Sequence, residues 1–99
     1  MILSVIYPNH DGARFDADYY RAAHAPLAME ILRPDSATLV EGVPMPGAPA
    51  APYALIAHFH FASPEAMQAA LASPRLGELQ ADIANFTDIR PTLMPGKPL

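Results

Sequence analysis

Two histidines and one tyrosine are the side chains of this sequence best suited to acid–base chemistry. His24 follows Tyr20 by four residues, a spacing that places both side chains on one face of a helix. Because an imidazole changes charge near neutral pH, His24 is a candidate general base, and the Tyr20 hydroxyl could orient a carbonyl or phenolate substrate. A structural role for His24 stays open, because Pro26 leaves the carbonyl of Ala22 without its helical partner and His24 could bond that group.

His58 is the second candidate and lies in the middle of residues 53–61, the segment with the strongest strand pattern. A polar side chain buried there needs a hydrogen-bond partner, because an unpaired one costs about 1–3 kcal/mol. If His58 faces the helices, it can line one cavity with His24. If it faces the other way, it belongs to a dimer interface. The odd positions of 53–61 are the more hydrophobic set, which favours them as the packed side, and both alternatives for His58 stay open.

A metal site is a further possibility for the histidines. The pair His58-x-His60 projects two imidazoles from one side of a strand, and His24 could be a third ligand. No carboxylate belongs to this set, and His60 lies near the strand end where solvent reaches it, so we expect no metal site. The sequence also lacks a phosphate-binding loop, a Rossmann fingerprint and a nucleophile elbow. We therefore expect no cofactor.

The composition indicates a small protein that buries part of its surface against a partner. The chain has 99 residues, of which 52% are hydrophobic and only 16% charged, against about 25% charged in typical domains. A homodimer is the simplest way to cover the excess apolar surface. A net charge of −4 without any basic cluster argues against nucleic acid, and the absence of cysteine excludes disulfides. The first apolar run ends at Tyr7-Pro8, too short to span a membrane, and we expect a cytoplasmic protein without membrane contact.

The secondary-structure signals alternate between strands and helices. A long helix is predicted over 17–32, with Asp16 as its N-cap and an irregularity at Pro26. Ser63-Pro64 and Ser73-Pro74 predict a short helix, a break and a second helix. Residues 42–52 contain four prolines and are predicted to form a loop. Four segments have the patterns of strands: 2–7, 38–41, 53–61 and 87–94.

These elements follow the order β-α-β-β-α-β within a single domain of residues 1–99. The order is typical of the α+β, ferredoxin-like fold, which has one antiparallel sheet with both helices on one face. The other face of the sheet needs a cover. Pairing of two sheets in a homodimer supplies that cover and agrees with the composition.

Three blocks of the sequence form a characteristic succession of motifs. They are Tyr7-Pro8-Asn9 with Gly12-Ala13-Arg14-Phe15-Asp16, Tyr19-Tyr20 and His24-Ala25-Pro26-Leu27; Tyr53 to His58 with Phe61-Ala62-Ser63; and Asp82-Ile83-Ala84-Asn85-Phe86-Thr87-Asp88-Ile89 with Pro91. With these motifs the chain resembles the EthD family, named for ethyl tert-butyl ether degradation. The resemblance implies a dimeric α+β barrel with a cavity between sheet and helices in each protomer. Small polyketide cyclases of this superfamily have His-Pro where this chain has Ser73-Pro74, which argues against a cyclase that uses that histidine.

The resemblance also implies a role in oxidative catabolism, with a small apolar or aromatic oxygenated compound bound in the cavity. We expect Tyr20, Phe59 and Asn85 to contact that compound. His24 and His58, with Tyr20, would then perform cofactor-free proton transfer or oxygenation, as in an isomerase, dehydratase, decarboxylase or oxidoreductase. The alternative is a non-catalytic carrier, or an accessory protein of an oxygenase system.

Overall fold

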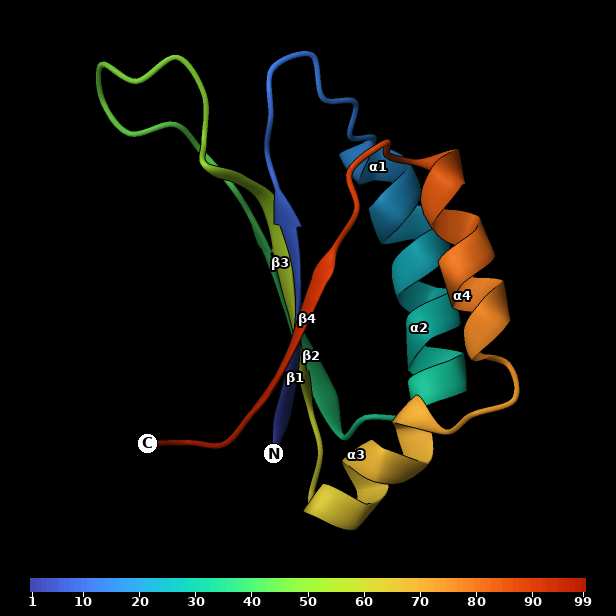
Figure 1. Ribbon diagram of the computed structural model, residues 1–99. Coiled ribbons are helices and arrows are strands. Elements are labelled where there is room, and N and C mark those ends of the chain that lie inside the picture. Colours follow the sequence, from blue (N-terminus) through green and yellow to red (C-terminus); the bar gives the residue numbers. More distant parts are fainter.

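The computed structural model describes all 99 residues and contains one four-stranded antiparallel sheet with helices on one side (Figure 1). The strands are β1 (Ile2–Pro8), β2 (Ser36–Glu41), β3 (Tyr53–His60) and β4 (Thr92–Gly96). Their order across the sheet is β2-β3-β1-β4, and every neighbouring pair is antiparallel. The α+β, ferredoxin-like architecture predicted from the sequence is confirmed.

The helices form a second layer over one face of the sheet (Figure 1). The first helical run consists of α1 (Ala17–Tyr19), η1 (Tyr20–His24) and α2 (Ala25–Leu32). The second consists of α3 (Pro64–Leu71), α4 (Leu76–Asp82) and η2 (Ile83–Asn85). Helices α2 and α4 lie side by side, and α3 lies at one end of the layer. None of the helices combines the length and the apolar character that crossing a lipid bilayer requires.

Two of the three predicted helix starts, Asp16 and Ser63-Pro64, are those of the structure. The third is wrong, because α4 begins at Leu76 with Arg75 as its N-cap, and the Ser73 hydroxyl accepts a hydrogen bond from the N–H of Arg75 in the turn before it. The Asp16 side chain accepts a hydrogen bond from the backbone N–H of Tyr19, and Ser63 accepts one from Ala66. Each bond satisfies one of the free N–H groups at a helix N-terminus. Pro64 then occupies the first turn of α3, where its missing N–H costs no hydrogen bond.

Pro26 produces a local change of helix type. The chain stays helical from Ala17 to Leu32, but residues 20–24 form a π-helical turn in which the N–H of Ala25 bonds the carbonyl of Tyr20. Pro26 then lies at the start of the regular helix α2. Such single π turns are frequent at functional sites, and this one contains both Tyr20 and His24.

The last strand differs from its predicted range. β4 begins at Thr92 and continues through Gly96, whereas 87–94 was expected. Pro91 has no N–H to donate to a strand ladder, and β4 follows it at the edge of the sheet. Thr87 makes only an isolated bridge with Phe15, and its hydroxyl donates to the Arg14 carbonyl and accepts from the N–H of Ile89. These bonds fix a turn where a strand was expected.

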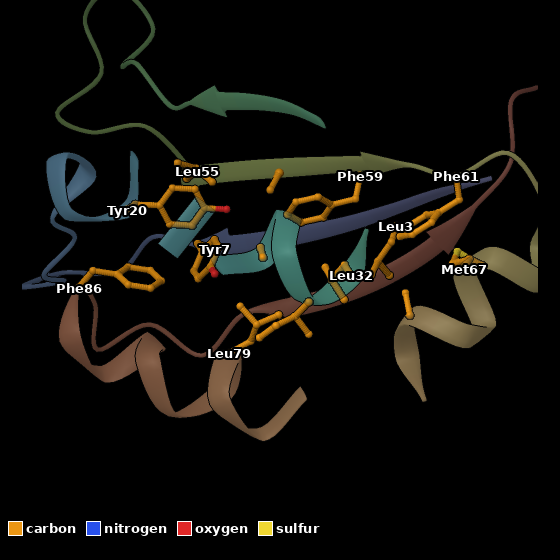
Figure 2. Close-up of a cluster of buried hydrophobic side chains, with 14 of the residues drawn as sticks. Leu3, Tyr7, Tyr20, Leu32, Leu55, Phe59, Phe61, Met67, Leu79 and Phe86 are labelled. Atoms are coloured by element: carbon orange, nitrogen blue, oxygen red, sulfur yellow. The ribbon is translucent and has the colours of Figure 1, made fainter. Parts of the chain in front are cut away.

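The hydrophobic core lies between the sheet and the helices (Figure 2). On β3 the buried side chains are those of the odd positions Leu55, Ala57 and Phe59, whereas Tyr53 at the strand's beginning is exposed. The odd side is therefore the side packed under the helices, as the hydrophobic pattern favoured. Since side chains alternate along a strand, the even positions of β3, including His58, face away from the helices.

Candidate functional site

A small apolar pocket lies between the helices and strands β1, β3 and β4. Its volume is about 90 Å³, and 12 of the 15 residues that line it are hydrophobic. Phe59 of β3 and Leu79 of α4 lie on opposite walls. Leu93 of the edge strand β4 also lines the pocket and is 53% exposed, so the pocket reaches the surface beside that strand. Phe59 is thus located where a ligand contact was expected.

His24 lies at this pocket with its two ring nitrogens in different environments. Its side chain is almost completely buried, and Nδ1 lies 2.8 Å from Oδ2 of Asp82. The imidazole therefore does not bond the Ala22 carbonyl, which was the structural alternative for this residue. Nε2 has no hydrogen-bond partner in the protein. Because no fully buried side-chain nitrogen or oxygen lacks a partner, Nε2 retains some accessible surface, and His24 is among the residues that line the pocket.

The environment keeps His24 neutral near pH 7. Burial lowers the pKa of His24 because it disfavours the charged ring, and the hydrogen bond and negative charge of Asp82 only partly offset this effect. The net pKa lies below its ordinary value of 6.5. We assign the proton of the neutral ring to Nδ1, since a carboxylate at 2.8 Å needs a donor there. Nε2 then has a free lone pair, as a general base requires.

Asp82 is held by three donors. Burial raises the Asp82 pKa, but hydrogen bonds from Asn85, Tyr19 and His24 outweigh burial, and the net pKa lies below its ordinary value. The Tyr19 hydroxyl donates to Oδ1 at 2.7 Å, and Nδ2 of Asn85 donates to the same oxygen at 3.0 Å. Asp82 is therefore an anion that orients His24. Asn85 is exposed and does not line the pocket, so the structure places it behind Asp82 and away from the expected ligand contact.

Two tyrosines also have hydroxyl groups without a partner in the protein. Tyr7 of β1 is 1% exposed and Tyr20 of η1 is 2% exposed, and both line the pocket. In Figure 2 their hydroxyl oxygens point into the space between sheet and helices. As for His24, the absence of any fully buried unpaired oxygen means that both hydroxyls retain some accessible surface. Burial raises the pKa of both phenols well above the usual range, so both are neutral at pH 7.

Phe86 holds the three polar rings in place from one side. It is fully buried, and its ring centroid lies 4.6 Å from that of His24, 5.2 Å from that of Tyr20 and 5.8 Å from that of Tyr7. The Tyr20 and His24 rings also contact each other, with centroids 5.2 Å apart. Contacts of this kind limit ring rotation in a close-packed interior. The polar atoms of the site are therefore positioned before any ligand arrives.

The structure separates His58 from His24. His58 lies on the open face of the sheet, where Nδ1 is 2.8 Å from the Ser4 hydroxyl. His60 is on the same face, with Nε2 3.2 Å from the Thr38 hydroxyl. The predicted cavity shared by His24 and His58 is therefore wrong. The odd positions of β3 are packed under the helices, so His58, at an even position, faces the other way. The three histidines do not form a metal centre, and no three metal-binding side chains elsewhere lie close enough to do so.

Sequence analysis missed two residues of the site, Tyr7 and Asp82. Tyr7 lies four residues after Leu3 on β1 and so on the same, packed side of the strand, but a tyrosine at a strand end is equally typical of a core residue. Asp82 lies three residues after Leu79 and four before Phe86, so a carboxylate lies on the apolar side of the helix. The position of this carboxylate on an apolar helix side was the signal that could have identified Asp82, because a buried charge requires a partner.

Comparison with known proteins agrees with the fold. The EthD domain model matches residues 11–90. An EthD-like protein of Ralstonia eutropha JMP134, known from a crystal structure, is 33% identical, with a TM-score of 0.82 over 94% of this chain and 86% of its own. An EthD family protein of Bacillus halodurans C-125 is 20% identical, with a TM-score of 0.76 over 99% of this chain and 97% of its own.

A more distant solved structure has the same fold. It is a protein of Arabidopsis thaliana, 16% identical, with a TM-score of 0.69 over 99% of this chain and 94% of its own. No curated protein matches the chain.

Proposed function

The chain belongs to the EthD family, and from this premise we propose that it binds a small apolar or aromatic oxygenated compound between sheet and helices and transfers a proton on that compound through His24. One observation carries the proposal. Nδ1 of His24 is held by Asp82 at 2.8 Å, while Nε2 has no partner in the protein and is not fully buried, and His24 lines a largely apolar pocket. A buried base with its tautomer fixed and its lone pair free is suited to proton abstraction.

The surroundings of His24 suit a reaction without a cofactor. The neutral ring takes the proton at Nε2, and the Asp82 carboxylate stabilises the imidazolium that forms. The largely apolar walls lower the local polarity, which strengthens this interaction. Isomerisation, dehydration, decarboxylation and oxygenation of an electron-rich compound all include such a proton transfer.

The size of the pocket limits the compound. An apolar cavity of about 150 Å³ holds benzene, and the pocket here has a volume of about 90 Å³. The pocket is therefore smaller than a cavity that holds benzene, so a ring compound such as phenol would have to extend past Leu93 toward solvent. Several such compounds are commercially available as probes.

Binding and proton transfer can be tested separately. Phenol, γ-butyrolactone and cyclopentanone would be titrated into isotope-labelled protein, with amide shifts of residues around the pocket as the readout. Exchange of carbon-bound hydrogen for deuterium would then be followed for cyclopentanone and γ-butyrolactone in D2O. We expect the wild type to bind and exchange, His24→Gln to bind without exchange, and His58→Gln, on the other sheet face, to behave as the wild type.

The alternative function gives a different result. A non-catalytic carrier or an accessory protein of an oxygenase system would bind the probes with no exchange above the buffer rate, and His24→Gln would bind them equally well. That result would contradict proton transfer and leave a binding role for the pocket.

The open face of the sheet supports a homodimer as part of the same proposal. This face has no helical cover (Figure 1) and carries apolar side chains on all four strands. Val40 of β2 and Met94 of β4 are about half exposed, and Ile6 and Ile56 lie between them. Exposed apolar patches of this kind are typical of protein contact surfaces. A second copy of the chain would present the same apolar face.

A further inference from the structure

Three polar atoms without a protein partner belong to residues that line one largely apolar pocket, whose other polar lining residue is Gln80. They are Nε2 of His24 and the hydroxyl oxygens of Tyr7 and Tyr20, and each belongs to a side chain that is at least nine-tenths buried. None of the three atoms is fully buried, so each is open to a water molecule or a ligand. Three such atoms around one largely apolar pocket give it the means to bind a ligand that is itself polar at more than one point.

The charges around the pocket restrict that ligand to a neutral molecule. No lysine, arginine, aspartate or glutamate is among the lining residues. A carboxylate or phosphate ligand would find no positive charge here, and Asp82 behind His24 would repel it. An ammonium ligand would lie in an apolar cavity with its charge unpaired.

The polar atoms also differ in what they offer. His24 offers a lone pair at Nε2, because its proton is bound at Nδ1 toward Asp82. Tyr7 and Tyr20 offer O–H donors, because burial keeps both phenols protonated. They come from different elements, Tyr7 from β1 and Tyr20 with His24 from η1. A matching ligand needs an acidic hydrogen at one place and an acceptor oxygen at another.

We propose that the substrate is a small neutral carbonyl compound with a hydrogen on the carbon next to the carbonyl, whose oxygen accepts hydrogen bonds from Tyr7 and Tyr20 while its C–H faces Nε2 of His24. This assignment rests on the proposed function of His24 and adds to it the substrate class and a role for Tyr7. Phenols match less well, because their acidic hydrogen and their acceptor oxygen are on the same atom.

The chemical step is an enolisation and balances without another reactant. The C–H bond breaks and its proton moves to Nε2 of His24. The electron pair of that bond forms the carbon–carbon double bond of the enolate, and the carbonyl π pair moves to the oxygen. The two tyrosine hydroxyls stabilise the negative oxygen as a preorganised oxyanion site. The proton then returns from His24 to carbon, to the same atom or to another atom of the delocalised system.

Tyrosine variants with cyclopentanone as the probe test this assignment. Tyr7→Phe and Tyr20→Phe remove one hydroxyl each, and Tyr53→Phe removes an exposed hydroxyl outside the pocket as the matched control. The readouts are the infrared carbonyl stretch of bound cyclopentanone and the rate of its hydrogen–deuterium exchange. Cyclopentane serves as the apolar reference ligand.

We expect the carbonyl stretch to lie at lower frequency in the wild type than in a hydrocarbon solvent, and to move back in Tyr7→Phe and Tyr20→Phe. Each of these variants should lose about 10²-fold in exchange rate, as enzymes do on loss of one oxyanion donor. His24→Gln should retain the low stretch frequency and lose the exchange. Tyr53→Phe should match the wild type in both readouts.

The failure of this assignment is distinguishable from the failure of the proposed function. If Tyr7→Phe and Tyr20→Phe retain both the stretch frequency and the exchange rate while His24→Gln loses exchange, the carbonyl assignment is overturned and His24 remains the base. If His24→Gln exchanges at the wild-type rate, the proposed function fails, whatever the tyrosine variants do. Wild-type protein that binds cyclopentanone no more tightly than cyclopentane also overturns the assignment.

Discussion

Nδ1 of His24 and Oδ2 of Asp82 lie 2.8 Å apart although 58 residues separate them in the sequence. His24 ends the π turn η1, and Asp82 is the last residue of α4. The contact therefore exists only because the two helical runs lie side by side over the sheet (Figure 1). The protonation state of His24, the candidate base, therefore depends on how the two helical runs pack.

Asp82→Asn should strongly reduce proton transfer by His24 and should reduce the stability of the fold only moderately. An amide can donate to Nδ1, which would favour the tautomer with its proton on Nε2 and remove the free lone pair. We expect cyclopentanone exchange to fall by at least about 10²-fold, and the free energy of unfolding to fall by about 1–3 kcal/mol through loss of charged hydrogen bonds. Nitrogen-15 NMR of the His24 ring reports the tautomer. Asp35→Asn, at an exposed carboxylate without a side-chain hydrogen bond, is the control. An unchanged tautomer in Asp82→Asn would contradict the assigned role.

The depressed pKa of His24 predicts the direction of a pH effect on stability. Because the folded-state pKa lies below the ordinary value of 6.5, the unfolded chain binds more protons between the two values. The contribution of His24 to stability is therefore complete above pH 6.5 and is lost as pH falls through the folded-state pKa. Exchange activity should fall over the same range, since only the neutral ring is a base.

Urea unfolding of the wild type and His24→Gln at a series of pH values measures this effect. The wild type should lose stability as the pH falls below 6.5, and His24→Gln should lose less over the same window. Equal slopes in the two proteins would show that the buried imidazole is not responsible.

The order of strands and helices was predictable because its signals are local. Alternation on residues 53–61, the N-caps Asp16 and Ser63, and the prolines at 64 and 74 each act within a few residues. The same pattern favoured the odd side of β3 as the packed side, but it left open whether that side faces the helices or a partner sheet, and so it left the position of His58 open. Tyr20 was expected at a cavity because its four-residue spacing from His24 puts both on one helical face, and it lines the pocket together with Phe59.

The contacts between side chains within the site were not predictable from local sequence signals. The contact of His24 with Asp82 depends on how two helices pack, which no local pattern states. Asn85 was expected against the ligand, but its position near the helix end turns it toward Asp82. The free hydroxyl of Tyr7 becomes apparent only when all its neighbours are known. In each case the missing information was a long-range contact.

Tyrosine hydroxyls in and behind the pocket should differ in their effect on stability. Tyr7→Phe and Tyr20→Phe remove hydroxyls without a protein partner, so they should leave the melting temperature unchanged or raise it. Tyr19→Phe removes the 2.7 Å donor to Asp82 and should lower it. Calorimetry of the three variants, with Tyr53→Phe as reference, measures the contrast. A lower melting temperature for Tyr7→Phe would indicate that its hydroxyl has a structural partner.

Tyr19 should also influence His24 without touching the ligand. Its hydroxyl helps to keep the pKa of Asp82 below the ordinary value, so its removal makes the carboxylate easier to protonate. In Tyr19→Phe we expect the acid limb of the exchange–pH profile to change position while binding of cyclopentanone stays the same. A purely structural tyrosine would alter stability and leave the profile unmoved.

The open face of the sheet predicts how charge substitutions act on the oligomeric state. Val40→Lys and Ile56→Lys would place an ammonium group inside the proposed interface, where it has no partner, and should raise the dimer dissociation constant at least about tenfold. His58→Ala should weaken the dimer and leave ligand binding intact, because His58 faces away from the pocket. Light scattering over a range of protein concentrations measures dissociation. Val43→Lys, in the exposed loop between β2 and β3, is the control. A wild-type protein that stays monomeric at every concentration would overturn the homodimer, and the open face would then need another cover.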